Sequence, residues 1–310
     1  MELAEAFLLT VITAATPLLL AAMGELIAER SGVLNLGVEG MMVTGAVAAF
    51  AGAQLTGSAY VGVIFGAMAG AILAALFAVL VLYFVTNQVA TGLALTLFGL
   101  GLSGLIGADY VGVPGIKLAP LLGAGPQDMS GPIAVIWRLL LGHDLLVYLS
   151  IASVPAVIWF LNRTRSGLVL RAVGDSHGSA HALGYGVLAV RFLAVLFGGA
   201  MAGLGGAYLS LVYTPQWTDA MTAGRGWIAL ALVVFASWLP KRVALGAYLF
   251  GGVTLLQFHL QAIGVSVPAQ LLNALPYIAT IVVLVAISGN RRLIAVNTPA
   301  CLGKPFVPDR

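Results

Sequence analysis

Long apolar runs separated by short polar segments dominate the chain. The run from Tyr60 to Val85, for example, contains no ionisable side chain other than tyrosine. A helix of about 20 apolar residues crosses the hydrocarbon core of a bilayer, so a run of this length predicts a membrane-spanning helix. Such runs predict about nine spans, near residues 6–24, 36–53, 60–84, 89–107, 144–161, 192–213, 225–238, 243–263 and 270–288.

The composition supports a membrane protein. Hydrophobic residues make up 61% and charged residues 8% of the sequence, whereas globular domains carry about 25% charged residues. We therefore expect an all-α, polytopic helical membrane protein that forms one transmembrane domain over residues 1–310. The apolar N-terminal run is preceded by acids and not by basic residues, so it predicts a first spanning helix and not a cleaved signal peptide.

The basic residues predict the orientation. With the N-terminus outside and the C-terminus cytoplasmic, they divide strongly in favour of the cytoplasm, as the positive-inside rule requires. This orientation leaves an external loop at 108–143 and a cytoplasmic loop at 162–191. Outside lie Lys117, Arg138 and Arg225, and inside lie Arg30, Arg163, Arg165, Arg171, Arg191, Lys241, Arg242, Arg291, Arg292, Lys304 and Arg310.

Glycines recur at helical spacing inside the apolar runs. Small residues four positions apart let two helix backbones approach closely in lipid. The pattern therefore predicts a tightly packed bundle, without indicating a function. The examples are Gly66 with Gly70, Gly199 with Gly203, and the series Gly99, Gly101, Gly104 and Gly107.

One carboxylate, Glu39, falls within the second predicted span. A carboxylate at this depth usually faces an aqueous cavity or a partner. Asn35 lies four positions earlier, so a continuous helix would put both side chains on one face, and Gly37 and Gly40 would allow this helix to bend. Asn35 and Glu39 are therefore candidates for a translocation path. The alternative is that Glu39 pairs with Arg30 or caps a helix end near the cytoplasmic surface.

A second polar cluster begins the predicted span at 225–238. Arg225 stands between two glycines at its external start, followed by Trp227. The segments "RSGVLNLG" and "GRGWIALA" thus both place an arginine and a glycine before a short span, one approached from inside and one from outside. Opposite approach is typical of inverted repeats, and it makes Arg225 and Trp227 further candidates for the path.

The cytoplasmic loop contains a short helical pattern, "SHGSAHAL", between Gly174 and Gly184. Asp175 or Ser176 would cap the start of this helix, and Gly184 would end it. A small helix below the membrane is suited to docking a partner protein. An ordinary loop helix is the alternative interpretation.

Signatures of catalysis and of metal binding are missing from the sequence. It contains no P-loop, no H-E-x-x-H and no G-x-S-x-G motif. The four histidines do not form a ligand set, and a lone Cys301 has no cysteine to pair with. We therefore expect no enzyme activity, no metal site and no cofactor bound by this chain. The basic residues are dispersed among the loops, which gives no reason to expect a nucleic-acid partner.

Three segments carry a resemblance to a known family: "ERSGVLNLGVEGMMVTGA", "RSGLVLRAVGDSHGSAHALGYGV" and "GRGWIALALVVFASWLP". In this order they resemble the permease subunits of bacterial ABC importers. The closest group is that of the nucleoside and simple-sugar permeases, related to ribose and branched-chain amino-acid permeases. The resemblance covers residues 5–290, and Glu39 stands where the family has the acid of its N-x-G-x-E-G stretch.

The resemblance implies an assembly in the bacterial cytoplasmic (inner) membrane. A second permease, identical or paralogous, would form the path together with this chain, and two ABC ATPase subunits, which carry ATP-Mg, would bind below. An external substrate-binding protein or lipoprotein would deliver the substrate. The coupling helix would comprise Gly174, Asp175, Ser176, His177, Ala180, His181 and Gly184, although the chain has "DSH" at 175–177 where family members often have Glu-Asn-Pro.

For the substrate, the resemblance implies a nucleoside or nucleobase, with a simple sugar or a branched-chain amino acid as alternatives. An ion-coupled secondary transporter, in which Glu39 would carry a proton, is the rival mechanism. No chain of further embedded acids is recognisable in the predicted spans to support it. An intramembrane enzyme lacks a nucleophile–base pair or a metal set in the sequence.

Overall fold

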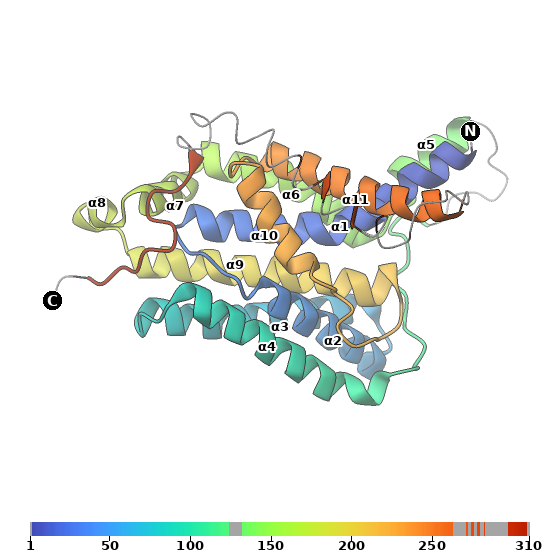
Figure 1. The fold of residues 1–310 in the computed structure, drawn as a ribbon, viewed down its shortest axis with the longest axis horizontal. Helices are drawn as coiled ribbons and strands as arrows, with labels where there is room; N and C mark the ends of the chain where they lie inside the picture. Colours follow the sequence, from blue (N-terminus) through green and yellow to red (C-terminus); the bar gives the residue numbers. More distant parts are fainter. Residues whose placement is uncertain are drawn as a thin grey trace.

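The computed structural model describes residues 2–123, 132–262 and 297–308, together with six single positions between 271 and 282. Within these ranges the chain forms a bundle of α-helices and no extended strand. The long helices lie side by side, as Figure 1 shows. The expectation of an all-α protein is therefore confirmed for the described residues.

The helices follow one another in chain order with short connections. Five-residue π-helical turns extend α3 (Val79–Tyr83) and α9 (Leu209–Tyr213), and a 3₁₀ turn (Ala108–Tyr110) extends α4. The helices are α1 (Glu2–Arg30), α2 (Val38–Thr56), α3 (Ala59–Ala78), α4 (Gln88–Gly107), α5 (Pro132–Leu140), α6 (Leu145–Arg163), α7 (Arg165–Asp175), α8 (His177–Ala182), α9 (Val187–Tyr208), α10 (Arg225–Phe235) and α11 (Pro240–Ala262).

Six helices in the described part are long and apolar enough to cross a membrane. They correspond to the first six predicted spans. The span predicted at 225–238 is only partly helical, because α10 has 11 residues and is too short to cross. The eighth predicted span corresponds to the 23-residue α11, and most of the ninth, at 270–288, falls outside the described residues. The six spans are Phe7–Arg30, Val38–Thr56, Ala59–Tyr83, Gln88–Tyr110, Leu145–Arg163 and Val187–Tyr213.

The end of the first span was predicted wrongly. The sequence pattern placed it at residue 24, before the acids Glu25 and Glu29, whereas α1 continues to Arg30. Glu25 is 1% and Glu29 0% exposed, so the other helices enclose both carboxyl groups. The chain therefore carries two more buried acids than the sequence pattern indicated.

Glycine contacts pack α9 against α1, α2 and α3. A Cβ atom on Gly70 of α3 would lie 2.2 Å from the carbonyl oxygen of Gly199, and one on Gly45 of α2 would lie 2.4 Å from the Cα of Gly203. The prediction of tight glycine packing is confirmed at these positions. It is wrong for Gly101 and Gly104 of α4, which face open space.

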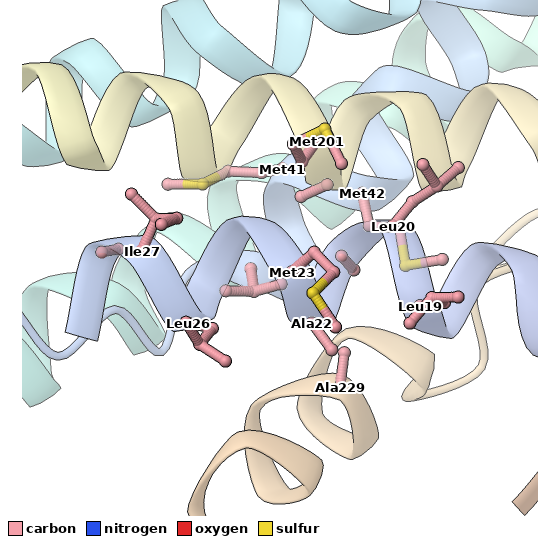
Figure 2. Packing of buried hydrophobic residues seen from close by; sticks show 14 of the residues in the cluster. Leu19, Leu20, Ala22, Met23, Leu26, Ile27, Met41, Met42, Met201 and Ala229 are labelled. Atoms are coloured by element: carbon pink, nitrogen blue, oxygen red, sulfur yellow. The ribbon is translucent and has the colours of Figure 1, made fainter. Parts of the chain in front are cut away.

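The centre of α1 lies between α9 and α10. Figure 2 shows Met201 of α9 on one side of α1 and Ala229 of α10 on the other, with Met23 of α1 between them. Met41 and Met42 of α2 complete a methionine-rich part of this core, and all of these side chains are buried. Flexible thioethers fill the irregular spaces that remain between closely spaced helix backbones.

The bundle has two distinct ends. Contacts of Gly24 with Gly198, and of Pro17 with Gly205, show that α1 and α9 run antiparallel. The end of α1, the helices α7 and α8, the start of α9 and residues 297–308 gather at one end, which we call the α8 end (Figure 1). The start of α1 and α5 lie at the opposite end, which we call the α5 end.

The basic residues segregate with these ends. Those predicted to be cytoplasmic lie at the α8 end, as far as they are described: at the ends of α1 and α6, in α7, and at the starts of α9 and α11. Lys304 joins them through its carbonyl contact with Arg191. Arg138 of α5 lies at the opposite end. The predicted orientation expects this separation, although Arg225, also predicted outside, begins α10 inside the bundle.

Candidate functional site

The second spanning helix starts inside the bundle. After α1 ends at Arg30, residues 31–37 form a non-helical segment, and α2 begins at Val38. Gly40, in the first turn of α2, contacts Gly99 of α4: a Cβ atom added to Gly99 would lie 2.7 Å from the Gly40 carbonyl oxygen. Gly99 is near the midpoint of the Gln88–Tyr110 span. The start of α2 therefore lies at about mid-depth of the bundle.

The start of α10 meets the start of α2. A Cβ atom on Gly226 would lie 2.6 Å from the Cα of Glu39. From this junction α2 runs toward the α5 end, where Gln54 donates to the carbonyl of Pro114. α10 runs toward the α8 end, where Trp238, just beyond it, contacts Glu29 and Arg30. Two interrupted helices thus face each other with their N-termini and run in opposite directions.

The Glu39 carboxylate joins these two helix starts. Its Oε1 accepts from the Thr222 hydroxyl at 2.6 Å and from the Gly224 amide at 2.8 Å. Its Oε2 accepts from the Gly226 amide at 2.6 Å. Unpaired amides and the helix dipole make a helix N-terminus favourable for a negative charge. Glu39 therefore caps α10 from another helix.

Of the two interpretations of Glu39 left open by the sequence, the geometry matches the capping of a helix end. That helix end lies at mid-depth and not near the cytoplasmic surface, as the sequence interpretation had it. Arg30 does not pair with Glu39, since its guanidinium donates to the carbonyls of Asn297 at 2.9 Å and Trp238 at 3.0 Å. Glu39 is 4% exposed.

The expected helical face shared by Asn35 and Glu39 does not exist. Asn35 precedes α2, and its side-chain oxygen accepts from the Gly37 amide at 2.9 Å to form a turn. Its own backbone amide donates to Glu25 at 3.2 Å. The sequence interpretation failed because the helix starts three residues after Asn35, so a four-residue spacing carries no meaning there. Asn35 shapes the approach to α2.

Arg225 lies at the junction and not at the external start of a span. One terminal nitrogen of its guanidinium donates to the carbonyls of Met221 at 3.1 Å and Thr222 at 3.3 Å. The guanidinium carbon lies 5.6 Å from the centre of the Tyr213 ring, a favourable cation–π distance. Trp227 is 47% exposed and thus presents a large side chain on the outer surface of the chain.

Two acids near the end of α1 were not among the sequence candidates. Glu29 accepts a hydrogen bond from the indole of Trp238, and Glu25 accepts from the Asn35 amide. Each carboxyl keeps one oxygen without a hydrogen-bond partner in the structure. Glu25 and Glu29 are four positions apart, which puts both on one face of a helix, and this spacing was the available signal. It was missed because the span was ended at residue 24.

The helix predicted in the cytoplasmic loop is confirmed as α8. The hydroxyl of Ser176 accepts from the Ser179 amide at 3.3 Å and caps its start. Gly184 has a φ of +86°, which favours glycine, and ends the turn after α8. The preceding residues are also helical, as α7, and α8 lies beyond the ends of the long helices (Figure 1).

The predicted docking residues of α8 divide between its outer and inner sides. Asp175, His181 and Gly184 are exposed, and Ser176 and His177 are half-buried. Gly174 and Ala180 point inward: an added Cβ on Gly174 would lie 2.1 Å from the Arg30 carbonyl oxygen, and Ala180 is 2% exposed. Two exposed apolar side chains were missing from the prediction, Leu183 at 76% and Tyr185 at 43%.

The ring of His177 has an unusual electrostatic environment. Its Nδ1 lies 3.1 Å from a terminal nitrogen of Arg191. Partial burial, the charge of Arg191 and that of Lys304 all lower the pKa of His177. The ring therefore stays neutral at physiological pH and accepts a hydrogen bond from Arg191.

The chain is a multi-pass helical membrane protein, because six of its described helices can cross a membrane and pack through buried glycine contacts. Interrupted helices that meet at mid-depth are typical of transporters. The comparison with protein families gives the particular family. Residues 7–287 match the branched-chain amino acid transport system / permease component family. The chain belongs to this family and is the permease subunit of an ABC transporter in the cytoplasmic membrane.

Relatives from bacteria and archaea cover almost the whole chain. It is 39% identical to the putative glucose ABC transporter permease protein of Haloferax volcanii, over 92% of each protein. It is 30% identical to a nucleoside ABC transporter permease protein of Lactococcus lactis, over 89% of this chain and 90% of the relative. It is also 30% identical to a guanosine ABC transporter permease protein of Bacillus subtilis, over 96% and 94%. No solved structure matches the chain.

Proposed function

We propose that the chain is the permease of an importer for a solute that contains a sugar ring, namely a nucleoside or a simple sugar. The relatives in the comparison carry nucleosides, guanosine or glucose in their names. Nucleosides and sugars share a ring with several hydroxyl groups, which a weakly polar path of donors and acceptors can accommodate. A branched-chain amino acid, named in the family description, is the second candidate.

In this proposal the α8 end is cytoplasmic and the α5 end is external. The basic residues at the α8 end support the orientation. Two ABC ATPase subunits with ATP-Mg bind at the α8 end, and a substrate-binding protein or lipoprotein binds at the other. A second permease, identical or paralogous, pairs with this chain. The chain itself supplies no catalytic group and no cofactor.

The observation that carries the assembly is the exposed surface of α8 and the residues after it. Leu183 and Tyr185 are exposed apolar side chains in the turn after α8, and α8 lies beyond the ends of the long helices (Figure 1). In the proposed orientation this place is surrounded by water and not by lipid. An exposed apolar surface at such a place is typical of a protein interface. Asp175 and His181 add polar groups around it. We assign this surface to the ATPase.

The junction of α2 and α10 is the proposed moving part of the path. Its two helix N-termini meet at mid-depth and run in opposite directions, which is the geometry of an inverted repeat. In this role Glu39 and Asn35 hold the shape of the junction, since both are enclosed by the chain. Arg225 and Trp227 are the candidates for contact with solute at the surface facing the second permease.

Transport by the complete complex tests the proposed function. The chain, purified from its native membranes in mild detergent with its bound subunits, is reconstituted in vesicles and supplied with ATP. Labelled guanosine, glucose and leucine are offered in turn with the binding protein. ATP-dependent uptake of guanosine or glucose is the expected result. Uptake of leucine alone would favour the second candidate, and uptake without ATP would replace the importer by a secondary transporter.

Cross-linking tests the assigned surface directly. In a Cys301→Ser background, Leu183→Cys is combined with a cysteine-reactive photo-cross-linker. We expect a cross-link to the ATPase subunit. Leu105→Cys is the matched control, because Leu105 is also 76% exposed but lies on α4. Cross-linking from both positions, or from neither, would contradict the assignment.

A further inference from the structure

Arg191 connects three separate segments at the α8 end. Its side chain is 0% exposed. Its Nε donates to the carbonyl of Ser31 at 3.1 Å, one terminal nitrogen to the carbonyl of Lys304 at 3.1 Å, and the other to His177 at 3.1 Å. The rigid guanidinium fork offers donors in several fixed directions, which a lysine ammonium cannot reproduce.

Residues 297–308 lie along the same end of the bundle and bind it through their backbone. The Cys301 amide donates to the carbonyl of Gly174 at 2.8 Å, and the Gly303 amide donates to that of Gly32 at 3.1 Å. With the Arg191 bond to Lys304, this segment is tied to α7, to α9 and to the turn after α1. These bonds involve backbone groups, so they depend little on the identity of the side chains.

Phe306 contacts α8 through its aromatic ring. Its ring centre lies 5.2 Å from that of His177 and 5.3 Å from that of His181, both on α8. The same ring packs on the buried cluster of Val173, Ala180 and Val187. A six-residue helix is not stable by itself, because nucleation is costly. The position of α8 therefore depends on these contacts.

The turn after α1, to which Arg191 and residues 297–308 bind, leads to the junction of α2 and α10. Ser31 and Gly32, which bind Arg191 and Gly303, begin the non-helical segment that ends at Val38. The Gly174 backbone touches the Arg30 carbonyl so closely that a methyl group would not fit. A displacement of α8 therefore reaches the start of α2 through contacts that leave little free space.

We propose that Arg191 and Phe306 are positioning residues for energy coupling: together with residues 297–308 they join α8 to the turn before α2, so that movement imposed on α8 reaches the Glu39 junction. This inference rests on the proposed function, in which α8 receives the movement of the ATPase. It assigns to residues 297–308 a mechanical role that neither the apolar pattern nor the family motifs indicate. Packed groups with discrete arrangements transmit such movements between sites.

The test measures the number of solute molecules imported per ATP hydrolysed by the complete transporter in vesicles. Phe306→Ala and Arg191→Lys are compared with the wild type, each as assembled complex isolated by size exclusion. We expect both changes to lower this ratio by about fivefold or more, the lower range of coupling between distant sites. ATP hydrolysis continues, because the exposed side of α8 is unchanged. Phe306→Tyr keeps the ring and restores the ratio.

The matched control is Val307→Ala, since Val307 is adjacent to Phe306 but 62% exposed. We expect the wild-type ratio from this variant. A wild-type ratio in both Phe306→Ala and Arg191→Lys, or an equal loss of transport and hydrolysis, would overturn the inference.

Leu183→Cys cross-linking to the ATPase, measured in the same variants, separates the two proposals. Without a cross-link from Leu183→Cys when no other change is made, the proposed assignment of the α8 surface to the ATPase fails. With the cross-link retained and the ratio unchanged, only the present inference fails.

Discussion

Glu39 allows the sharpest test of the junction, because Glu39→Gln keeps the shape of the side chain and changes its hydrogen bonding. The carboxylate accepts from three donors: the Thr222 hydroxyl and the amides of Gly224 and Gly226. A glutamine amide has a single oxygen. If that oxygen takes the Oε1 position, the NH₂ group faces the Gly226 amide, and two donors oppose each other without an acceptor.

The magnitude follows from three effects. A buried donor left without a partner costs about 1–3 kcal/mol, and removing a negative charge from a partly buried helix N-terminus costs up to about 2 kcal/mol. Against these, the neutral glutamine avoids the desolvation of a charge at mid-depth. We expect a net loss of about 2 kcal/mol in the free energy of unfolding. The effect of the unpaired Gly226 amide prevails because a backbone group cannot rotate away.

Equilibrium unfolding in mixed detergent, followed by tryptophan fluorescence, measures this loss. Thr44→Val is the matched control, since the Thr44 hydroxyl lies in the same helix but bonds only to the Gly40 carbonyl at 2.7 Å. A double-mutant cycle with Thr222→Val isolates the bond between Thr222 and Glu39. A Glu39→Gln protein within about 0.5 kcal/mol of the wild type would refute the capping argument. Transport should fall with the stability of the junction, while the ATPase still binds.

The other predictions concern helix packing and α8. Gly70→Ala should destabilise the bundle by about 2 kcal/mol or more, because the added methyl group overpacks α3 on α9. Gly101→Ala is the control and should have little effect, because the surroundings of Gly101 are open. Thermal unfolding compares the two proteins, and equal melting temperatures would contradict the predicted overpacking. Gly184→Val should uncouple transport from hydrolysis in a folded protein, because its φ of +86° is strained for valine; normal uptake would disprove the role of this turn, and Gly178→Ala on open helix surface is its control. The pKa of His177 is lower in the folded protein than in the unfolded chain, so His177 binds a proton more readily when the chain is unfolded. The contribution of neutral His177 to the free energy of unfolding is therefore fully present above about pH 6.5, and it is lost as the pH falls through the pKa of the folded state. A protonated His177 ring would be repelled by the positive charges of Arg191 and Lys304, and His181 is the other histidine on α8. We therefore expect the melting temperature to fall between about pH 7 and pH 5. His177→Asn should make the melting temperature less dependent on pH, and the same pH profile in both proteins would contradict this role of His177.

The sequence determined the class of the protein. Apolar runs longer than a bilayer is thick have no stable place in water, which dictates a helical membrane protein. Glycines at four-residue spacing predicted close helix packing, and the structure shows such packing between α3 and α9, where Gly70 meets Gly199. The start and end of α8 were also predictable, since a serine cap and a glycine with positive φ are local features. In each case the physics lies within a few neighbouring residues.

The tertiary structure decided the meaning of the polar residues. From the sequence, Glu39 was a candidate for lining a path, for pairing with Arg30 or for capping a nearby helix end, and the structure shows it capping a helix that starts more than 180 positions later in the chain. Arg191 counted only as one basic residue near a membrane surface, until the fold placed Ser31, His177 and Lys304 around it. Hydropathy alone cannot show at which depth of the bundle a helix starts, because that depth is set by the packing of distant segments. What a buried polar group does is set by the partner that satisfies it, and here those partners are brought near only by packing of distant segments.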